Sequence, residues 1–159
     1  MDILVIGGGG REHALVRKLK ESPLCGRIFC CPGNGGIAQD AELGPGSATD
    51  VEGAVALARE KRPDLVVVAP DDPLVLGMVD ALNAAGFRTF GPNKAAAMLE
   101  GSKAFSKGLM KKYGIPTAGY ETFSDLDEAL SYLTGRSCPI VVKADGLALG
   151  KGVIIAQTE

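Results

Sequence analysis

Ile3-Leu-Val-Ile-Gly-Gly-Gly-Gly10 is the stretch that decides the fold. Its first half is short and wholly apolar, which is typical of a strand buried on both faces of a parallel sheet. The four glycines end this strand, and residues 12–20 then predict a helix with Ala14, Leu15 and Leu19 on its apolar side. A strand, a glycine turn and a helix together predict an anion site at the helix N-terminus, where free N–H groups and the helix dipole converge.

A dinucleotide site is the first interpretation of this pattern, and two features argue against it. Glu12 stands where a G-x-G-x-x-G frame that starts at Gly7 needs its third glycine. The next predicted strand, Ile28-Phe-Cys-Cys31, runs into Pro32-Gly-Asn-Gly-Gly36, and no acid is placed there to hold an adenosine ribose. The pattern therefore predicts a Rossmann-like domain that binds phosphate without a nicotinamide cofactor.

Strands and helices go on alternating along the chain, which predicts an α/β fold with a parallel sheet. Thr49-Asp-Val-Glu52 is a capping-box pattern and predicts a helix that extends to about Lys61. Leu65-Val-Val-Val-Ala69 predicts another buried strand, and a helix over 74–85 follows it. The last strand of this domain is predicted at 89–90.

Two acids follow the predicted strand over 65–69, in the sequence Pro70-Asp-Asp-Pro73. In open α/β sheets the carboxyl edge is where ligands bind. Asp71 and Asp72 could hold sugar hydroxyls there, or they could complement the dipole of the helix that follows. The sequence leaves both interpretations open.

The composition changes after Pro92, where two linker helices and a smaller unit are predicted. The predicted elements are a helix over 94–99, a helix over 102–113 with Ser102 as its N-cap, a strand over 120–123, a helix over 125–133 capped by Ser124, and a strand over 140–142. This organisation predicts three parts, a Rossmann-like domain over 1–92, a helical linker over 93–116 and a small domain over 117–159.

Lys143-Ala-Asp-Gly-Leu-Ala-Leu-Gly-Lys-Gly-Val153 carries the strongest chemical signal, between the β-forming runs 140–142 and 153–156. Lysines supply positive charge, and glycines let backbone N–H groups approach an anion. A P-loop has the form G-x-x-x-x-G-K-[ST] and leads into a helix, whereas Gly146 and Gly150 are separated by three residues and a β-rich run follows. The stretch predicts a phosphate-binding loop in a hairpin, with an ordinary glycine hairpin and solvated lysines as the alternative.

Candidate ligating and nucleophilic side chains are few. Cys25, Cys30, Cys31 and Cys138 contain no C-x-x-C pair, so reduced and mostly buried thiols are expected. The single histidine, His13, lies beside the glycine loop, where a ligand-facing role and a structural role are both open. No Ser-His-Asp or Cys-His arrangement is readable, and no metal ligands are predicted within the sequence.

The composition is that of an ordinary globular protein. Of the 159 residues 46% are hydrophobic and 23% are charged, and the net charge of −2 provides no basic field for nucleic acid. Aromatic residues make up 5% and Trp is absent, which argues against a base-stacking surface. No signal peptide and no apolar run long enough for a bilayer are visible, so a cytoplasmic protein without a membrane partner is expected.

Taken together, these motifs resemble one family, phosphoribosylamine–glycine ligase, also called glycinamide ribonucleotide synthetase, an ATP-grasp enzyme of purine synthesis. The matching motifs are Gly8-Gly-Gly-Arg-Glu-His-Ala14, Pro32-Gly-Asn34, Pro70-Asp-Asp-Pro-Leu74, Phe90-Gly-Pro92, Gly101-Ser-Lys103 with Phe105, Tyr113-Gly-Ile-Pro-Thr-Ala118, and Lys143-Ala-Asp-Gly-Leu-Ala148 with Gly150-Lys-Gly-Val153. The resemblance covers roughly the first two-fifths of the family's usual length. It implies a Rossmann-like (pre-ATP-grasp) domain, linker helices and the first part of an ATP-grasp lid domain.

The resemblance also implies roles for individual residues. The residues implied for the phosphoribosylamine site are Gly8, Gly9, Gly10, Asn34, Asp71 and Pro73, and those implied for ATP are Lys103, Lys143, Gly150, Lys151 and Gly152, with Lys143 and Lys151 as the catalytic lysines. One departure concerns the acidic turn, because the family usually has Gly-Pro-Glu where this chain has Ala69-Pro-Asp71. The shorter side chain of Asp71 affects any contact with a ribose hydroxyl.

The reaction that the resemblance implies needs no protein nucleophile. ATP phosphorylates the glycine carboxylate, and the amine of phosphoribosylamine then attacks the acyl phosphate, giving glycinamide ribonucleotide, ADP and phosphate. Mg²⁺ or Mn²⁺ is implied, with ligands expected beyond residue 159, and these 159 residues are expected to be a monomeric and inactive N-terminal piece. The alternatives are another ATP-grasp ligase, against which the match at Arg11-Glu-His-Ala14 argues, and a non-catalytic sugar-phosphate or nucleotide-binding module.

Overall fold

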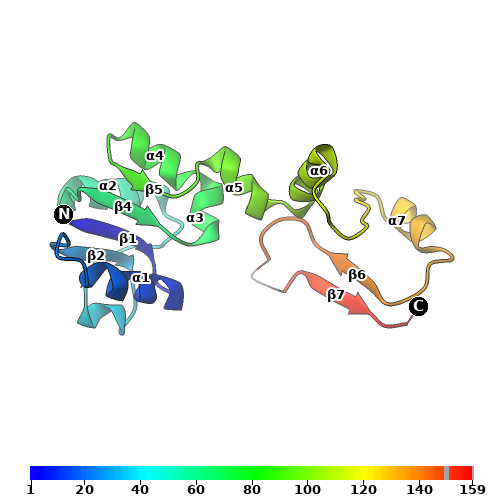
Figure 1. The fold of residues 1–159 in the computed structure, drawn as a ribbon, viewed down its shortest axis with the longest axis horizontal. Coiled ribbons are helices and arrows are strands. Elements are labelled where there is room, and N and C mark those ends of the chain that lie inside the picture. The colour runs from blue at the N-terminus through cyan, green and yellow to red at the C-terminus, as the bar shows by residue number, and fades with distance from the viewer. Residues whose placement is uncertain (149–150, 159) are drawn as a thin grey trace. The chain divides into compact units, whose positions relative to one another are not determined.

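The structure is a computed structural model that describes residues 1–148 and 151–158. These residues form two compact units, Met1–Met98 and Leu99–Glu159. The first unit contains a five-stranded parallel sheet with helices on both faces, and the second contains two helices and a hairpin (Figure 1). The α/β fold class predicted from the sequence is confirmed.

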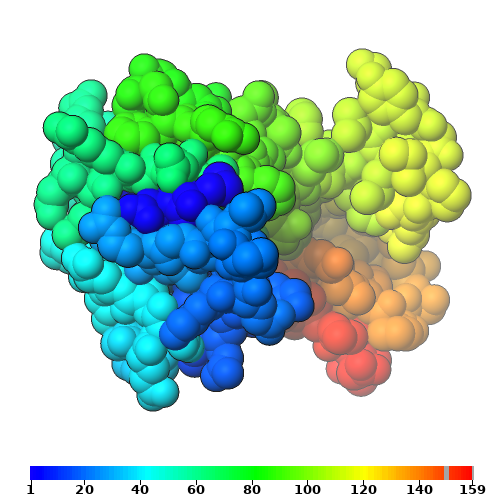
Figure 2. Space-filling view, turned by 60° about the vertical axis from the view of Figure 1, so that its left-hand side comes forward, coloured from blue at the N-terminus to red at the C-terminus, as the bar shows by residue number. Residues whose placement is uncertain are grey.

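The sheet of the first unit has β1 at its centre. Its spatial order is β3 (Glu42–Leu43), β2 (Ile28–Pro32), β1 (Ile3–Gly7), β4 (Leu65–Val68) and β5 (Thr89–Phe90). The chain passes outward from β1 through β2 to β3 and then returns to the other side of β1 as β4, so the strand order reverses beside β1. Figure 2 agrees with this order, because the dark-blue N-terminal residues lie between lighter blue and green ones. Ligands bind open α/β sheets at such a reversal, beyond the carboxyl ends of the strands.

Alternate residues of β1 belong to two separate cores, as the two-residue period of a strand requires. Leu4 and Ile6 pack in one core with residues of α2 (Val51–Lys61) and α4 (Met78–Ala84), while Ile3 and Val5 pack in the other with Val16 of α1 (Gly10–Lys20). All five residues of β1 are buried. This double burial explains why the strand is apolar throughout.

The apolar face predicted for helix α1 is confirmed for Leu15 and Leu19 and is wrong for Ala14. Val16 and Glu12 are its buried residues, whereas Ala14, expected on the apolar side, is exposed. Leu15 and Leu19 are half-buried and pack against the core as expected. Glu12 and Val16 are four residues apart and so lie on the same side of the helix. Glu12 can be buried there because its carboxylate accepts a hydrogen bond from the backbone.

Several boundaries differ from the predicted ones. The single helix predicted over 74–85 is two helices, because α3 (Asp71–Leu76) begins earlier than predicted and Gly77, with φ +93°, separates it from α4. Only glycine adopts this backbone conformation easily, so the helix breaks there. The short elements β3 and η1 (Ile37–Gln39) were not predicted; each is too short to carry a periodic signal.

The second unit begins within α5 (Lys94–Gly101) and continues with α6 (Lys103–Tyr113), α7 (Leu126–Leu133) and the antiparallel pair β6 (Ile140–Lys143) and β7 (Val153–Ala156). Ser102 is the N-cap of α6, as predicted, and its Oγ accepts a hydrogen bond from the Phe105 N–H at 3.0 Å. The strand predicted over 120–123 is wrong, because no strand forms there. The N-cap of α7 is Asp125 rather than Ser124.

The cysteines agree with the prediction of reduced and mostly buried thiols. All four are free; Cys30 and Cys31 are buried, and Cys25 and Cys138 are half-buried. Burial raises the pKa of the Cys30 thiol to about 12, so this thiol is protonated and unreactive at neutral pH. Across residues 1–148 and 151–158, no helix is both long enough and apolar enough to cross a bilayer.

The cap of α2 provides a stability test. Asp50, not the predicted Thr49, is the N-cap, and its carboxylate accepts a hydrogen bond from the Gly53 N–H at 2.9 Å. We expect Asp50→Ala to lower the free energy of unfolding by about 1 kcal/mol, because the helix loses its cap. Thr49→Ala, whose hydroxyl contacts only Ser47, should cost less than about 0.5 kcal/mol. Urea unfolding of the two variants measures both values, and equal losses would restore Thr49 as the cap.

Candidate functional site

The loops that follow β1 and β2 are joined at the carboxyl edge of the sheet. The Asn34 side chain donates a hydrogen bond from Nδ2 to the Gly8 carbonyl at 2.8 Å, and the Gly33 N–H donates to the Gly7 carbonyl at 3.0 Å. Asn34 Oδ1 also accepts from the N–H groups of Gly36 and Ile37, at 2.8 and 2.9 Å. These contacts use three of the four hydrogen-bonding positions of the amide. In this structure Asn34 therefore holds the shape of the glycine loop.

Glu12, the residue that breaks the dinucleotide frame, is an integral part of this loop. Its side chain is buried, and Oε2 accepts a hydrogen bond from the Gly9 N–H at 2.6 Å. A Cβ at Gly7 would lie 2.5 Å from Glu12 Cγ, and φ at Gly7 is +127°, so this position requires glycine. The Glu12 carboxylate accepts from one of the backbone N–H groups of the turn, so fewer N–H groups remain for an anion.

Arg11 connects the glycine loop to the turn that follows β4. Its Nη1 donates to the Ala69 carbonyl at 3.0 Å and lies 3.4 Å from Asp71 Oδ1. The side chains of Arg11 and Asp71 are 61% and 42% exposed, and a solvent-accessible ion pair of this kind contributes only about 0–1 kcal/mol. The guanidinium can therefore turn towards an incoming phosphate at little cost. Sequence reasoning gave Arg11 no role in the site, although it lies inside the most specific motif.

The acidic turn after β4 forms the start of α3 and lies at the carboxyl edge of the sheet. Asp71 and Asp72 are the first two residues of α3, where their charges complement the helix dipole, and both are half-buried. Both interpretations of this pair thus remain compatible with the structure. Pro73, implied as a substrate contact, is less than 2% exposed, so it supports the turn from the core and offers no surface to a ligand.

His13 lies behind the Asn34 loop. Its imidazole packs against Gly36, where a Cβ would lie 2.7 Å from His13 Cε1. Its buried Nε2 is 3.9 Å from Asp40 Oδ2, and it has no hydrogen-bond partner among the described residues. This arrangement favours a structural role, because the ring fills the space between α1 and the loop.

The lysine-rich loop of the second unit is a hairpin loop, as predicted. Lys143 is the last residue of β6 and pairs with Val153, and the Ala144 N–H donates to the Gly152 carbonyl at 2.8 Å. Lys143 and Lys151 are exposed at the two ends of this loop, while Gly150 lies outside the described residues. The Lys103 ammonium donates to the Gly146 carbonyl at 2.7 Å, so Lys103 contacts the same loop.

Asp145 is the residue of this loop that sequence reasoning missed. Its Oδ1 accepts a hydrogen bond from the Ala104 N–H at 3.1 Å, and the Ser102 hydroxyl lies 3.0 and 3.2 Å from the two carboxylate oxygens. The Ala104 hydrogen bond, followed by that of Ser102, holds the pKa of Asp145 below its usual value. The carboxylate is thus a charged second cap for α6.

Family profiles match both units. The profile described as "Phosphoribosylglycinamide synthetase, N domain" matches residues 1–100, and the one described as "Phosphoribosylglycinamide synthetase, ATP-grasp (A) domain" matches residues 101–159. The chain belongs to the phosphoribosylglycinamide synthetase family. The resemblance seen in the motifs is confirmed.

Individual relatives agree with this family. The chain is 54% identical to a phosphoribosylamine–glycine ligase of Pasteurella multocida and 52% identical to that of Haemophilus influenzae, in each case over 160 residues. Each match covers 99% of this chain and 37% of the relative, so the chain spans under two-fifths of the length of these proteins.

Solved structures give the same result. The crystal structure of a phosphoribosylamine–glycine ligase from Thermotoga maritima matches with a TM-score of 0.77 and 32% identity, over 99% of this chain and 36% of that one. N5-carboxyaminoimidazole ribonucleotide synthetase from the same organism matches with a TM-score of 0.71 and 22% identity, over 99% of this chain and 41% of that one, which shows a shared fold alone.

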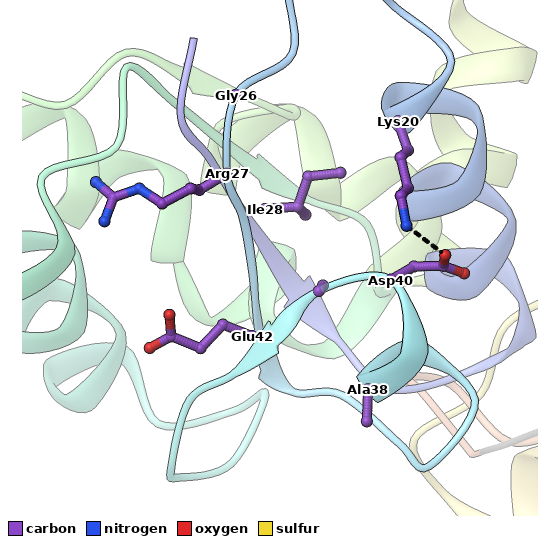
Figure 3. A pocket seen from close by; sticks show the side chains of 8 residues that line it. Lys20, Gly26, Arg27, Ile28, Ala38, Asp40 and Glu42 are labelled. Atoms are coloured by element: carbon purple, nitrogen blue, oxygen red, sulfur yellow. Dashed lines mark hydrogen bonds and ion pairs between the residues drawn. The ribbon is translucent and has the colours of Figure 1, made fainter.

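A pocket of about 320 Å³ lies at the amino edge of the five-stranded sheet, near the starts of β2 and β3 (Figure 3). Its charged side chains are paired within the protein, as Lys20 with Asp40 at 2.8 Å, Arg27 with Asp2 at 2.6 Å, and Glu42 with Lys61 at 2.8 Å. Paired charges leave little to attract an ionic ligand. The candidate site is therefore the carboxyl edge, not this pocket.

The Lys20–Asp40 pair gives a pH prediction. The hydrogen bond from Lys20, together with the charges of Lys20, Arg17 and His13, holds the pKa of Asp40 below its usual 3.8. A carboxyl whose pKa is lower in the folded state contributes stability above its unfolded pKa and loses it as the pH falls through the folded pKa. The unfolding free-energy difference between wild type and Asp40→Asn should be constant from pH 7 to about 5 and shrink below about pH 4.

Urea unfolding at stepped pH measures this difference. Lys20→Met is the matched variant, because it should remove most of the same pH-dependent contribution while leaving the carboxylate in place. A difference between wild type and Asp40→Asn that persists unchanged to pH 3 would contradict the assignment.

Proposed function

We propose that a protein carrying this sequence ligates glycine to 5-phosphoribosylamine at the expense of ATP and yields glycinamide ribonucleotide, ADP and phosphate. The observation that carries the proposal is the family match over both units, together with relatives at 49–54% identity that are named phosphoribosylamine–glycine ligases. The reaction belongs to purine synthesis. We place the protein in the cytoplasm, acting as a monomer without nucleic-acid or membrane partners.

The sugar-phosphate substrate is proposed to bind at the carboxyl edge of the first unit. Gly8, Gly9 and Gly10 surround the N-terminus of α1, where the helix dipole favours a phosphate. Arg11 supplies the positive charge, and its weak contact with Asp71 lets it move. Asp71 then offers its carboxylate oxygens to ribose hydroxyls. Asn34 keeps the glycine loop in the conformation that exposes its edge.

ATP is proposed to bind the second unit. Lys103 and Lys143 offer ammonium groups beside the hairpin loop, and Gly150, Lys151 and Gly152 form the segment that closes over the phosphates. Catalysis then requires positioning and charge stabilisation and no nucleophilic side chain, which fits the lack of any catalytic triad in the sequence. A closed loop would also keep water from the acyl phosphate intermediate.

Magnesium or manganese, when bound, would neutralise negative charge on the phosphates of ATP. Among the described residues, no group of three or more His, Cys, Asp or Glu side chains could hold a metal ion. We propose that the residues of this chain contribute lysines and backbone N–H groups to the binding of the phosphates.

The reaction is tested by a protein that carries this sequence within a full-length ligase. We expect ADP to form over many turnovers only when glycine and phosphoribosylamine are both present, because the acyl phosphate forms on glycine and is consumed by phosphoribosylamine. A coupled ADP assay with each substrate omitted in turn measures this dependence. The isolated 159 residues should show no such activity, and ADP formation with an unrelated acid and amine would overturn the assignment.

The role of Lys143 is tested in the same full-length protein. Lys143→Ala should reduce kcat/KM for ATP by about a hundredfold, because one charged donor to the phosphates is lost. Its affinity for phosphoribosylamine should stay within about twofold of wild type. Lys111→Ala, at an exposed lysine in the last turn of α6, is the control and should leave both unchanged. Equal losses for ATP and phosphoribosylamine would argue against the assignment of Lys143.

A further inference from the structure

The loop after β6 and the start of α6 are joined by a set of contacts within the second unit. Ser102 caps α6 and also contacts Asp145, whose Oδ1 accepts from the Ala104 N–H. Lys103 lies between Ser102 and Ala104 in the sequence. Its ammonium donates to the carbonyl of Gly146, the residue after Asp145. Three consecutive residues of α6 and its cap thus contact two consecutive residues of the loop.

Capping alone does not require Asp145. The Phe105 N–H at the start of α6 already donates to Ser102, the residue directly before the helix. Asp145 comes from a segment 43 residues away from Ser102, so its contacts fix where that segment lies. A carboxylate at a helix N-terminus is favoured by the dipole, and its hydrogen bonds to N–H and O–H groups are charge-assisted.

The same contacts hold the side chain of Lys103 and the backbone on either side of the loop root next to Lys143. Lys143 precedes Asp145 by two residues, and its backbone is held by pairing with Val153. Lys103 is held from the other side by Gly146. Asp145 lies between these two anchoring points, so a shift of its carboxylate would move the root of the loop relative to α6. The hydrogen bonds described for Asp145 point to α6 and its cap, which makes it a poor candidate for direct contact with a nucleotide.

We propose that Asp145 is a positioning residue for ATP, because its carboxylate joins the root of the glycine-rich loop to α6 and so holds the backbone of Lys143 at a fixed position relative to Lys103. The inference rests on the proposed function, since it assumes that these lysines meet the nucleotide phosphates. Misplacing a binding group by about an ångström can cost up to about a hundredfold in rate. Asp145 would therefore act on ATP alone among the three substrates.

The test uses the full-length protein carrying this sequence and compares two aspartates that cap helices of the same unit. Asp145→Ala should weaken ATP binding in calorimetry about tenfold or more and raise the KM for ATP similarly, with the KM values for glycine and phosphoribosylamine unchanged. Asp145→Asn should retain much of the affinity, because its amide oxygen still accepts from Ala104. Asp125→Ala is the control, since Asp125 caps α7 through the Glu128 N–H at 3.0 Å and does not touch the loop. It should lower thermal stability without changing ATP affinity.

A double-mutant cycle with Lys103 separates positioning from general destabilisation. In a Lys103→Ala background, Asp145→Ala should cause at most a further twofold loss of ATP affinity, because the Lys103 ammonium that Asp145 helps to position is already absent. Equal ATP affinity in wild type and Asp145→Ala, or equal effects of Asp145→Ala and Asp125→Ala, would overturn the inference. Failure of the proposed function looks different, because ATP would bind without glycine-dependent ADP formation.

Discussion

Close packing around Gly7 is the constraint on which the first unit depends. The Gly7 carbonyl accepts from the Gly33 N–H, and a Cβ at Gly7 would lie 2.5 Å from Glu12 and 2.8 Å from Pro70. The ends of β1 and β2, the start of α1 and the turn after β4 therefore meet at one residue without a side chain. Any larger residue would separate these segments, and with them the residues proposed to hold the sugar phosphate.

The first-unit sheet could be predicted from the sequence because its strands β1, β2 and β4 are apolar runs with burial on both faces. Helix ends were harder to predict, because neighbouring residues compete for the same cap. Asp50 caps α2 in place of Thr49, and Asp125 caps α7 in place of Ser124. The strand predicted over 120–123 had β-forming residues but no partner strand, and a strand forms only where another segment pairs with it.

The sequence pointed to residues that could line the two candidate sites, but it did not point to the contacts that shape the loops around them. Glycine loops and lysines are visible in the sequence as motifs. The contacts of Arg11 with Ala69 and of Ser102 with Asp145 join residues 58 and 43 positions apart, and no local pattern signals such contacts. The motif around Asn34 implied a ligand contact. Most hydrogen-bonding positions of its side chain are instead used within the protein.

Both candidate sites place a carboxylate at a helix N-terminus beside a glycine loop. Glu12 accepts from the Gly9 N–H at the start of α1, and Asp145 accepts from the Ala104 N–H at the start of α6. A negative charge so close to a phosphate site would repel the ligand if it were free. Each carboxylate instead accepts hydrogen bonds from backbone N–H groups, and in the proposed function the attraction comes from Arg11 and the lysines. Glycine permits the close approach of backbone and ligand, and the hydrogen bonds of Glu12 and Asp145 restrict the conformational freedom of the residues that they contact.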